Sequence, residues 1–274
     1  MKKWTVVKFR EAKGQTKLAC VTAYDYAFAK LADEAGIPLV LVGDSLGMTM
    51  LGYSSTLPVT MDDMLRHTAA VARGASTNTL VIGDLPFLSY QVNLEEGVRN
   101  AGRLIQAGAD AVKLEGCRPE LVRACVETGI PVMGHIGLTP QSVNVFGGFK
   151  VQGKTQEAGE RLLKEALALE EAGAFALVIE CTPPDIAAAI TRALKIPTVS
   201  CGAGPACDGM IVVLHDMLGF TSHTPKFIKR YAEIGDRVKE AFTTFAREVA
   251  DGSYPGPEQT YAASGFIPPP PEKS

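Results

Sequence analysis

The sequence predicts an α/β fold built around a parallel β-sheet. Eight short apolar segments recur along the chain, and stretches with helical periodicity separate them. Segments that are rich in Val, Ile and Leu and apolar on both faces are typical of parallel strands covered by helices. Because eight such strands can close on themselves, we expect a single (β/α)8 barrel (TIM barrel). A doubly wound open sheet is the alternative, since residues 203–209 leave room only for a turn before the last strand.

The elements alternate from one end of the chain to the other. The predicted strands are residues 18–25, 37–44, 79–85, 109–115, 130–137, 174–182, 196–202 and 210–216. The predicted helices are residues 26–34, 61–73, 94–107, 119–127, 156–171, 184–194 and 226–250. Thr60 and Asn93 precede two of these helices as candidate N-caps, and acidic residues follow each of them in the first turn.

The two ends of the chain flank one domain. Residues 5–15 are expected to form an N-terminal helix that caps one end of the barrel, and the last helix is a C-terminal extension. The length of 274 residues suits one barrel, which typically needs about 250. We therefore predict a catalytic barrel domain over residues 1–256 and a Pro-rich tail over residues 257–274.

Composition excludes several classes of partner. The formal net charge is −3 and no Lys- or Arg-rich block is present, so neither nucleic acid nor an anionic membrane is expected as a partner. No segment approaches the roughly 18 apolar residues of a membrane helix. The six cysteines form no C-x-x-C pair, and several lie in apolar segments. We interpret them as reduced core thiols of a cytoplasmic protein.

Charged and polar residues gather where the predicted strands end. In parallel α/β folds these carboxyl ends share one face, which carries the active site of barrels. A charge buried there is costly unless it is paired or holds a metal. One such residue could be a helix N-cap, but a set from separate strands indicates a site. The residues are Asp25, Asp44, Asp84, Lys113, Glu115, His135 and Glu180.

Three of these carboxylates form a candidate metal site. Asp44, Asp84 and Glu115 come from three strands and offer only hard oxygen ligands, which Mg²⁺ prefers. The alternative is that Asp44 and Asp84 cap the following loops and that Glu115 pairs with Lys113. Lys113 and Glu115 lie two residues apart, so both side chains point to the same face of their strand. Lys113 could hold a substrate carboxylate or balance the charge.

Glu180 and His135 are the candidates for proton transfer and substrate contact. Glu180 ends an apolar strand, where a carboxylate suits general acid–base work, or where it could form a salt bridge. His135 could contact a ligand or be a buried hydrogen-bond partner, and we count it among the candidate substrate contacts. His67 lies on a predicted helix and is interpreted as structural.

The stretches that carry these residues resemble one enzyme family. They include GDSLGM, GDLPFLSY, AGADAVKLEG, GHIGLTPQSVN, GGFKVQG and CGAGPACDGMIVVLHDMLGF, and the resemblance runs from about residue 18 to residue 258. The chain resembles the ketopantoate hydroxymethyltransferases of the pantothenate pathway. The resemblance implies a (β/α)8 barrel, a homodecamer, 3-methyl-2-oxobutanoate as substrate, 5,10-methylenetetrahydrofolate as one-carbon donor and 2-dehydropantoate as product.

The resemblance also implies roles for individual residues. Mg²⁺ would be held at Asp44, Asp84 and Glu115. The substrate would contact the metal and four residues, which are Asp44, Ser45, Asp84 and Lys113. Glu180 matches the proton acceptor of the family.

Three positions depart from the family pattern, and none of them is a predicted ligand. Ser200 and Cys201 replace a glycine and an aliphatic residue, and Met210 replaces a glutamine. The nearest rival class is a lyase or mutase of the phosphoenolpyruvate–isocitrate lyase type, but its K-K-C-G-H loop is absent from this sequence. A barrel that only binds, or a purely structural oligomer, would be expected to lose the carboxylate set, which is present.

Overall fold

The strands form a closed barrel. The computed structural model describes residues 3–221, 224–262 and 265. Eight parallel strands follow one another around the barrel in sequence order, and β8 pairs with β1 to close it, so the open sheet is excluded. The strands are β1 (Leu18–Thr22), β2 (Leu39–Val42), β3 (Leu80–Asp84), β4 (Ala111–Lys113), β5 (Val132–Gly137), β6 (Ala176–Glu180), β7 (Thr198–Cys201) and β8 (Gly209–Val212).

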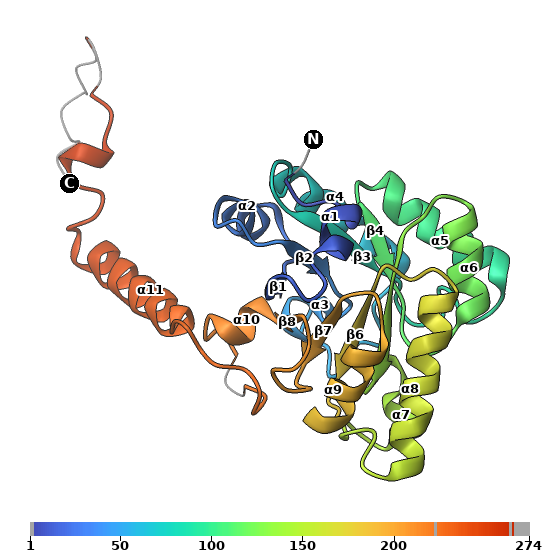
Figure 1. The fold of residues 1–274 in the computed structure, drawn as a ribbon. Coiled ribbons are helices and arrows are strands. Elements are labelled where there is room, and N and C mark those ends of the chain that lie inside the picture. The colour runs from blue at the N-terminus through green and yellow to red at the C-terminus, as the bar shows by residue number, and fades with distance from the viewer. Residues whose placement is uncertain (1–2, 222–223, 263–264, 266–274) are drawn as a thin grey trace.

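Helices surround the strands, as Figure 1 shows. The predicted N-caps are confirmed: the Thr60 hydroxyl accepts from the backbone N–H of Asp63 in a capping box, and the Asn93 side chain accepts from the N–H of Glu96. Such caps satisfy backbone donors that the first turn leaves unpaired. The outer helices are α2 (Tyr26–Glu34), α4 (Met61–Gly74), α5 (Leu94–Gln106), α6 (Pro119–Glu127), α8 (Gln156–Glu171) and α9 (Pro184–Ala193).

The core has two layers, one between strands and helices and one inside the barrel. The inner layer is closed at one end by α1 (Val6–Glu11), whose Phe9 is fully buried against the side chains of the strands. The Phe9 ring packs edge to face on Phe175 with 6.1 Å between centroids. The predicted capping helix is therefore confirmed, although it is shorter than residues 5–15.

An ion pair and hydrogen bonds to Asp208 hold the segment after α1 at the same end of the barrel. The Asp208 carboxylate accepts from Lys13 Nζ at 2.8 Å and from the backbone N–H of Gly14 at 3.1 Å. It also accepts from the backbone N–H of Thr198 at 2.8 Å. Asp208 thus joins the N-terminal plug to β7.

The C-terminal third differs from the prediction. Residues 214–217 are not part of the last strand but form α10 (Leu214–Met217), and the N–H of Leu214 donates to the Thr22 hydroxyl. The last helix, α11 (Ile234–Asp251), begins eight residues later than predicted. Its preceding segment is held against α10 by backbone hydrogen bonds from Tyr231 to Met217 and from Ile234 to Leu218, which prevent an earlier helical turn. The unpredicted short elements are α3 (Leu46–Thr49), η1 (Pro140–Ser142), α7 (Val143–Phe146) and η2 (Pro257–Gln259).

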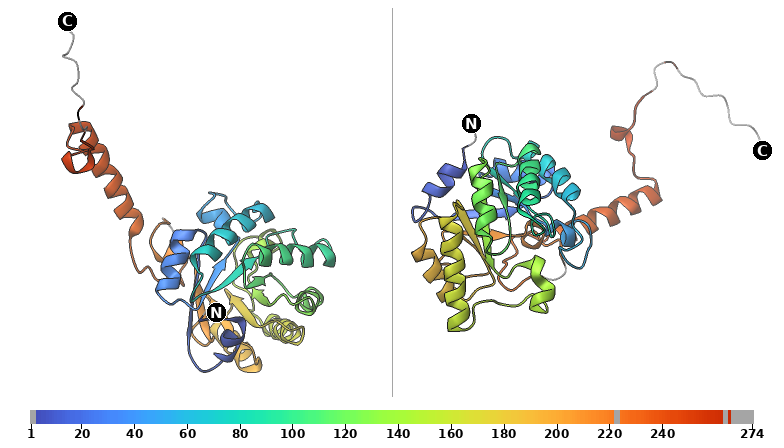
Figure 2. Two further views of the ribbon diagram at one scale, coloured as in Figure 1. Left: turned by 90° about the horizontal axis from the view of Figure 1, so that it is seen from above. Right: turned by 90° about the vertical axis from the view of Figure 1, so that its right-hand side faces the viewer.

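Helix α11 projects away from the barrel in both views of Figure 2, so it is a C-terminal extension as predicted. It contains no buried residue. Among the described helices, none combines the length and the apolarity needed to cross a bilayer. Most of the predicted Pro-rich tail lies outside the described residues, and the division of the chain at residue 256 stays a prediction.

Candidate active site

The predicted polar residues meet at the carboxyl ends of the strands. Asp84, Lys113 and Glu180 are the last residues of β3, β4 and β6. Asp44 and Glu115 each lie two residues beyond a strand. Asp25 is the exception, because its carboxylate accepts from the N–H of Phe28 and caps α2. All but Asp25 and Glu180 are nearly fully buried; this group is Asp44, Asp84, Lys113, Glu115 and His135.

Lys113 is paired with Asp84. Its Nζ lies 2.8 Å from Asp84 Oδ1, and the backbone N–H of Asp44 donates to Asp84 Oδ2 at 3.3 Å. The sequence allowed Lys113 to pair with Glu115, but in the structure its partner is Asp84. Burial alone would lower the pKa of Lys113, but the carboxylates around it, led by Asp84, raise the pKa above its ordinary value. Lys113 is a protonated cation in this site, which disfavours Schiff-base chemistry.

Asp44 and Glu115 are buried carboxyl groups whose pKa values are raised by their surroundings. Burial, followed by the charge of Asp84, raises the pKa of Asp44 to about 7. Burial also raises the pKa of Glu115 well above its usual range, and the charge of Asp44 adds to this effect. Three buried carboxylates against one lysine are the condition under which a divalent cation lowers the free energy of the site.

The donor set fits Mg²⁺ in its chemistry. Carboxylate oxygens are the ligands it prefers, and it usually keeps several waters while one or two carboxylates contact it directly. Within the described residues, no three His, Cys, Asp or Glu side chains already form a cluster that could hold an ion. The fit therefore rests on the oxygen chemistry of the three carboxylates and not on a preformed cluster of ligands.

Glu180 is the accessible acid of the site, with 16% of its side chain exposed. His135 lies between two acids: its Nε2 is 3.3 Å from Glu180 Oε2, and its Nδ1 is 3.7 Å from Glu115 Oε1. Neither buried ring nitrogen has a hydrogen-bond partner among the described residues. Cys201 is the register neighbour of Glu180 on β7, and burial, followed by the charge of Glu180, raises the pKa of its thiol, so this departure from the family pattern lies beside the site.

The backbone around Glu180 is closely constrained. Its carbonyl accepts from the N–H of Leu138 at 2.9 Å and from the Thr182 hydroxyl at 3.1 Å. The next residue, Cys181, has a φ of +43°, which non-glycine residues rarely adopt, and Gly137 on β5 has a φ of +92°. Strained backbone of this kind is held in place by its surroundings and is common beside functional groups.

Ser45 begins the short helix α3 directly after Asp44. Its Oγ lies 2.9 Å from the hydroxyl of Tyr24, which in turn accepts from the Thr22 hydroxyl at 2.9 Å. Ser45 is therefore anchored at the same end of the barrel as the carboxylates. His67 contacts the backbone carbonyl of Tyr24 from α4, which confirms its structural interpretation.

Sequence reasoning missed Gln141 and Tyr90. Gln141 is buried and donates hydrogen bonds to the carboxylates of Asp44 and Glu115. The Tyr90 hydroxyl donates to the side-chain oxygen of Gln141. Gln141 lies in the GHIGLTPQSVN stretch, but its side chain is uncharged. A search for charged residues at strand ends therefore does not select it.

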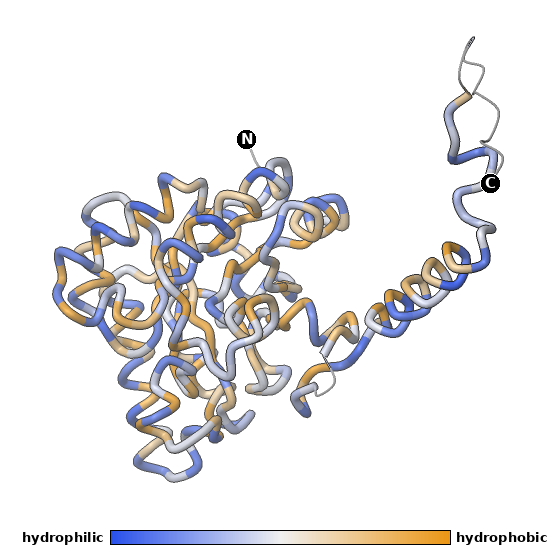
Figure 3. Tube along the Cα trace, turned by 180° about the vertical axis from the view of Figure 1, so that it is seen from behind, coloured by the Kyte–Doolittle hydropathy of each residue, from blue (hydrophilic) through white to orange (hydrophobic). Residues whose placement is uncertain are grey.

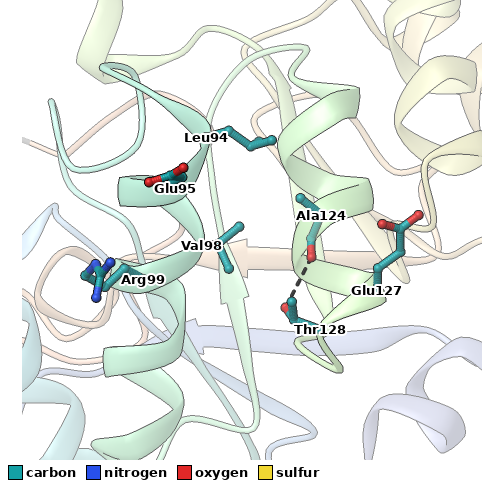
Figure 4. A pocket seen from close by; sticks show the side chains of 7 residues that line it. All are labelled: Leu94, Glu95, Val98, Arg99, Ala124, Glu127 and Thr128. Atoms are coloured by element: carbon teal, nitrogen blue, oxygen red, sulfur yellow. Dashed lines mark hydrogen bonds between the residues drawn. The ribbon is translucent and has the colours of Figure 1, made fainter.

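Two further features lie outside this group. A hollow on the outer surface lies between α5 and α6 (Figure 4). It shares no residue with the site; its lining is Leu94, Glu95, Val98, Arg99, Ala124, Glu127 and Thr128.

Three of the six cysteines, Cys20, Cys125 and Cys207, are buried as expected, whereas Cys117 is exposed.

A closed (β/α)8 barrel with buried carboxylates, a lysine and an accessible glutamate at the carboxyl ends of its strands has the arrangement of a barrel enzyme. Comparison with known proteins gives the family. The model of the ketopantoate hydroxymethyltransferase family matches residues 3–257, and the chain belongs to that family.

Individual relatives agree with this assignment. The chain is 54% identical over 265 residues to the 3-methyl-2-oxobutanoate hydroxymethyltransferase of Heliobacterium modesticaldum, covering 95% of this chain and 96% of the relative. It is 54% identical over 270 residues to the enzyme of the same name from Enterococcus faecalis, covering 96% and 97%.

Solved structures share the fold at low sequence identity. A phosphonopyruvate hydrolase in complex with oxalate and Mg²⁺ has a TM-score of 0.59 at 18% identity and covers 94% of this chain and 93% of its own. A 2,3-dimethylmalate lyase of the PEP mutase/isocitrate lyase superfamily has a TM-score of 0.58 at 15% identity, covering 93% and 91%. These likenesses show the fold alone.

Proposed function

We propose that this chain is a 3-methyl-2-oxobutanoate hydroxymethyltransferase of pantothenate biosynthesis, which yields 2-dehydropantoate. The one-carbon unit would come from 5,10-methylenetetrahydrofolate. The observation that carries the proposal is the position of Glu180: it is the accessible acid beside a buried group of carboxylates and a lysine, in a chain whose relatives bear this enzyme name.

We propose Mg²⁺ as the metal, held by Asp44, Asp84 and Glu115. When bound, it would act as a Lewis acid that polarises the ketone oxygen of the substrate. The raised pKa values of Asp44 and Glu115 support this role, because a bound cation would favour the ionised form of both carboxyl groups and offset the cost of burying it. A further support is the phosphonopyruvate hydrolase with oxalate and Mg²⁺, since a barrel of this fold takes a small dicarboxylate together with the ion.

The side chains of the protein would bind the substrate and move one proton. The Lys113 cation would attract the substrate carboxylate, and the Ser45 hydroxyl and His135 ring would contact the substrate. Glu180 would accept the proton from carbon 3 and leave an enolate, which attacks the methylene group of the folate. Water then displaces the folate nitrogen from the transferred carbon, which gives the hydroxyl of the product and releases tetrahydrofolate. The two freed nitrogens of the folate take up the carbon-3 proton and one proton of the water. General base catalysis of this kind contributes roughly 10²–10⁴ in rate.

Helix α11 supports the proposed association of subunits. Phe242, Phe245 and Val249 lie at i, i+3 and i+7 on one helix face and are 69%, 54% and 50% exposed. Figure 3 shows hydrophobic positions (orange) recurring along the projecting helix. A continuous apolar face of this size indicates an interface, and we propose a second copy of this chain as the partner. The homodecamer rests on the family resemblance, and the cytoplasmic location rests on the interpretation of the cysteines as reduced thiols.

Proton NMR of 3-methyl-2-oxobutanoate in D₂O tests the proposal, with the protein present and with or without Mg²⁺. We expect Mg²⁺-dependent loss of the carbon-3 proton signal, because deuterium replaces the proton that Glu180 removes. The Glu180→Gln variant should abolish this exchange, whereas Glu160→Gln, at an exposed position on α8, should keep it. Unchanged exchange in Glu180→Gln excludes Glu180 as the base, and no exchange by the wild-type protein, even with the folate present, argues against the activity.

A further inference from the structure

Gln141 donates hydrogen bonds to two carboxylates of the proposed metal site, one from its side chain and one from its backbone. Gln141 is 5% exposed and is part of the 3₁₀ turn η1 after β5. Its Nε2 donates to Asp44 Oδ2 at 2.9 Å, and its backbone N–H donates to Glu115 Oε2 at 2.9 Å. One residue therefore holds carboxylates that follow two different strands, β2 and β4.

The orientation of this amide is fixed by its other contacts. Nε2 also donates to the carbonyl oxygen of Leu85 at 2.9 Å, and that oxygen can only accept. On the opposite side, Gln141 Oε1 accepts from the hydroxyl of Tyr90 at 2.8 Å and from Gln91 Nε2 at 2.9 Å. If the amide were flipped, its oxygen would face both a carboxylate and a carbonyl. The hydrogen-bonding capacity of the side chain is fully used, as expected for a rigid buried network.

The carboxylates at this site differ in the groups that contact them. Asp84 has a lysine within 2.8 Å, which neutralises it. Within the described part of the chain, Gln141 is the only residue that donates a hydrogen bond to the side chain of Asp44 or of Glu115. An amide donor orients a carboxylate but adds no positive charge, so the neutralisation of Asp44 and Glu115 is left to a bound cation.

Tyr90 supports Gln141 and Glu115 together. Its hydroxyl accepts from the backbone N–H of Glu115 at 3.1 Å and lies 3.2 Å from the Glu115 carbonyl, in addition to its contact with Gln141. The guanidinium of Arg118 lies 5.7 Å above the Tyr90 ring. Because Tyr90 is buried, a shift of Gln141 would require this whole group to move.

We propose that Gln141 is a positioning residue that sets the separation and orientation of Asp44 and Glu115 for a divalent cation, with Tyr90 as its support. The proposal rests on the Mg²⁺ role proposed above. Residues that orient metal ligands typically change metal affinity by 10–100-fold when they are replaced. Gln141 does not contact the ion in this arrangement, since its Oε1 points to Tyr90 and Gln91 rather than to the carboxylates.

Isothermal titration of the full chain with Mg²⁺ tests the proposal. The Gln141→Met variant keeps the side-chain length and the backbone donor to Glu115 but removes the Nε2 donor to Asp44, and we expect its affinity for Mg²⁺ to fall about 10–100-fold. Tyr90→Phe leaves the donors in place but removes their support, and we expect a smaller loss. Gln156→Met is the matched control, because Gln156 lies exposed at the first turn of α8, and its affinity should equal that of the wild type.

A second readout separates positioning from general damage. Raising the Mg²⁺ concentration should restore carbon-3 proton exchange in Gln141→Met, because a weakened ligand set can be saturated, whereas a distorted fold cannot be repaired in this way. Wild-type affinity in folded Gln141→Met overturns the proposal, and so does wild-type affinity in Tyr90→Phe if Gln141→Met does not fold. Absence of Mg²⁺ binding by the wild-type protein instead overturns the proposed metal, and the role of Gln141 with it.

Discussion

Replacing Gly137 by alanine should damage the candidate base without touching its side chain. Gly137 is the last residue of β5 and is the register neighbour of Glu180 on β6. A Cβ at this position would lie 2.2 Å from the carbonyl oxygen of Glu180 and 2.7 Å from the Thr182 hydroxyl oxygen. The nearer of these atoms belongs to the backbone, so a side-chain rotation cannot relieve the clash.

The magnitude follows from two costs. A left-handed backbone costs alanine roughly 1–2 kcal/mol, and overpacking typically costs a further 1–3 kcal/mol. Even a tight 3.0 Å contact would require the two backbones to separate by about 0.8 Å, the difference between 3.0 and 2.2 Å. Because a misplacement of about 1 Å can cost about 10²-fold in rate, we expect carbon-3 proton exchange to fall by about that factor.

Two measurements check this prediction. Proton exchange is followed by NMR as above, and the free energy of unfolding is obtained from urea denaturation, where we expect a loss of about 2–5 kcal/mol. Gly102→Ala is the matched control: its Cβ would meet nothing closer than a side-chain methyl of Ile130 at 4.0 Å, and alanine favours its helix. If Gly137→Ala exchanges the proton as fast as Gly102→Ala, the constrained backbone of Glu180 is not important for catalysis.

Two further predictions concern stability and assembly. The pKa of Asp208 is lowered because hydrogen bonds from Lys13 and from the backbone N–H of Thr198 outweigh the raising effect of burial. The stabilisation by its carboxylate is therefore complete above the unfolded pKa of about 4 and is lost as the pH falls through the lower folded value. Asp208→Asn should reduce the free energy of unfolding by about 1.5–3 kcal/mol at pH 7. This difference should shrink in urea titrations near pH 3, and an equal loss at both pH values would contradict the ionic role. On α11, the combined Phe242→Glu and Phe245→Glu substitutions should lower the mass measured by light scattering, whereas Thr243→Glu should not; an unchanged mass would argue against this face as an interface.

Much of the fold could be predicted because the strands of a parallel barrel leave a strong signal. Each strand is buried on both faces, so it appears in the sequence as an apolar run, and each of the eight runs overlaps one strand of the barrel. The run at residues 210–216 was extended too far, because apolar residues continue into α10. The predicted start of the last helix at residue 226 was wrong because the backbone there hydrogen-bonds to α10, a tertiary contact that local periodicity does not reveal.

The candidate site was predictable only where burial has a high electrostatic cost. A charged residue at the end of an apolar strand is unusual, so Asp84, Lys113 and Glu180 could be found, and only Asp25 proved to be a helix cap. The sequence could not show that Lys113 pairs with Asp84 rather than with Glu115, because that choice depends on how far adjacent strands are offset in the barrel.

Neutral residues determine what the charged ones can do. Had a second lysine taken the place of Gln141, Asp44 and Glu115 would each have had a nearby cation, and the attraction of the site for Mg²⁺ would have been largely cancelled. The amide of Gln141 donates a hydrogen bond to a carboxylate without adding positive charge. Gly137 has no Cβ, and this lets β5 approach the carbonyl of Glu180 closely. Composition and periodicity reveal neither contact. The hydrogen bonds of Gln141, for example, depend on the loop that brings it within 3 Å of two acids. The charge pattern therefore locates the site, whereas its selectivity for a cation depends on residues that carry no charge.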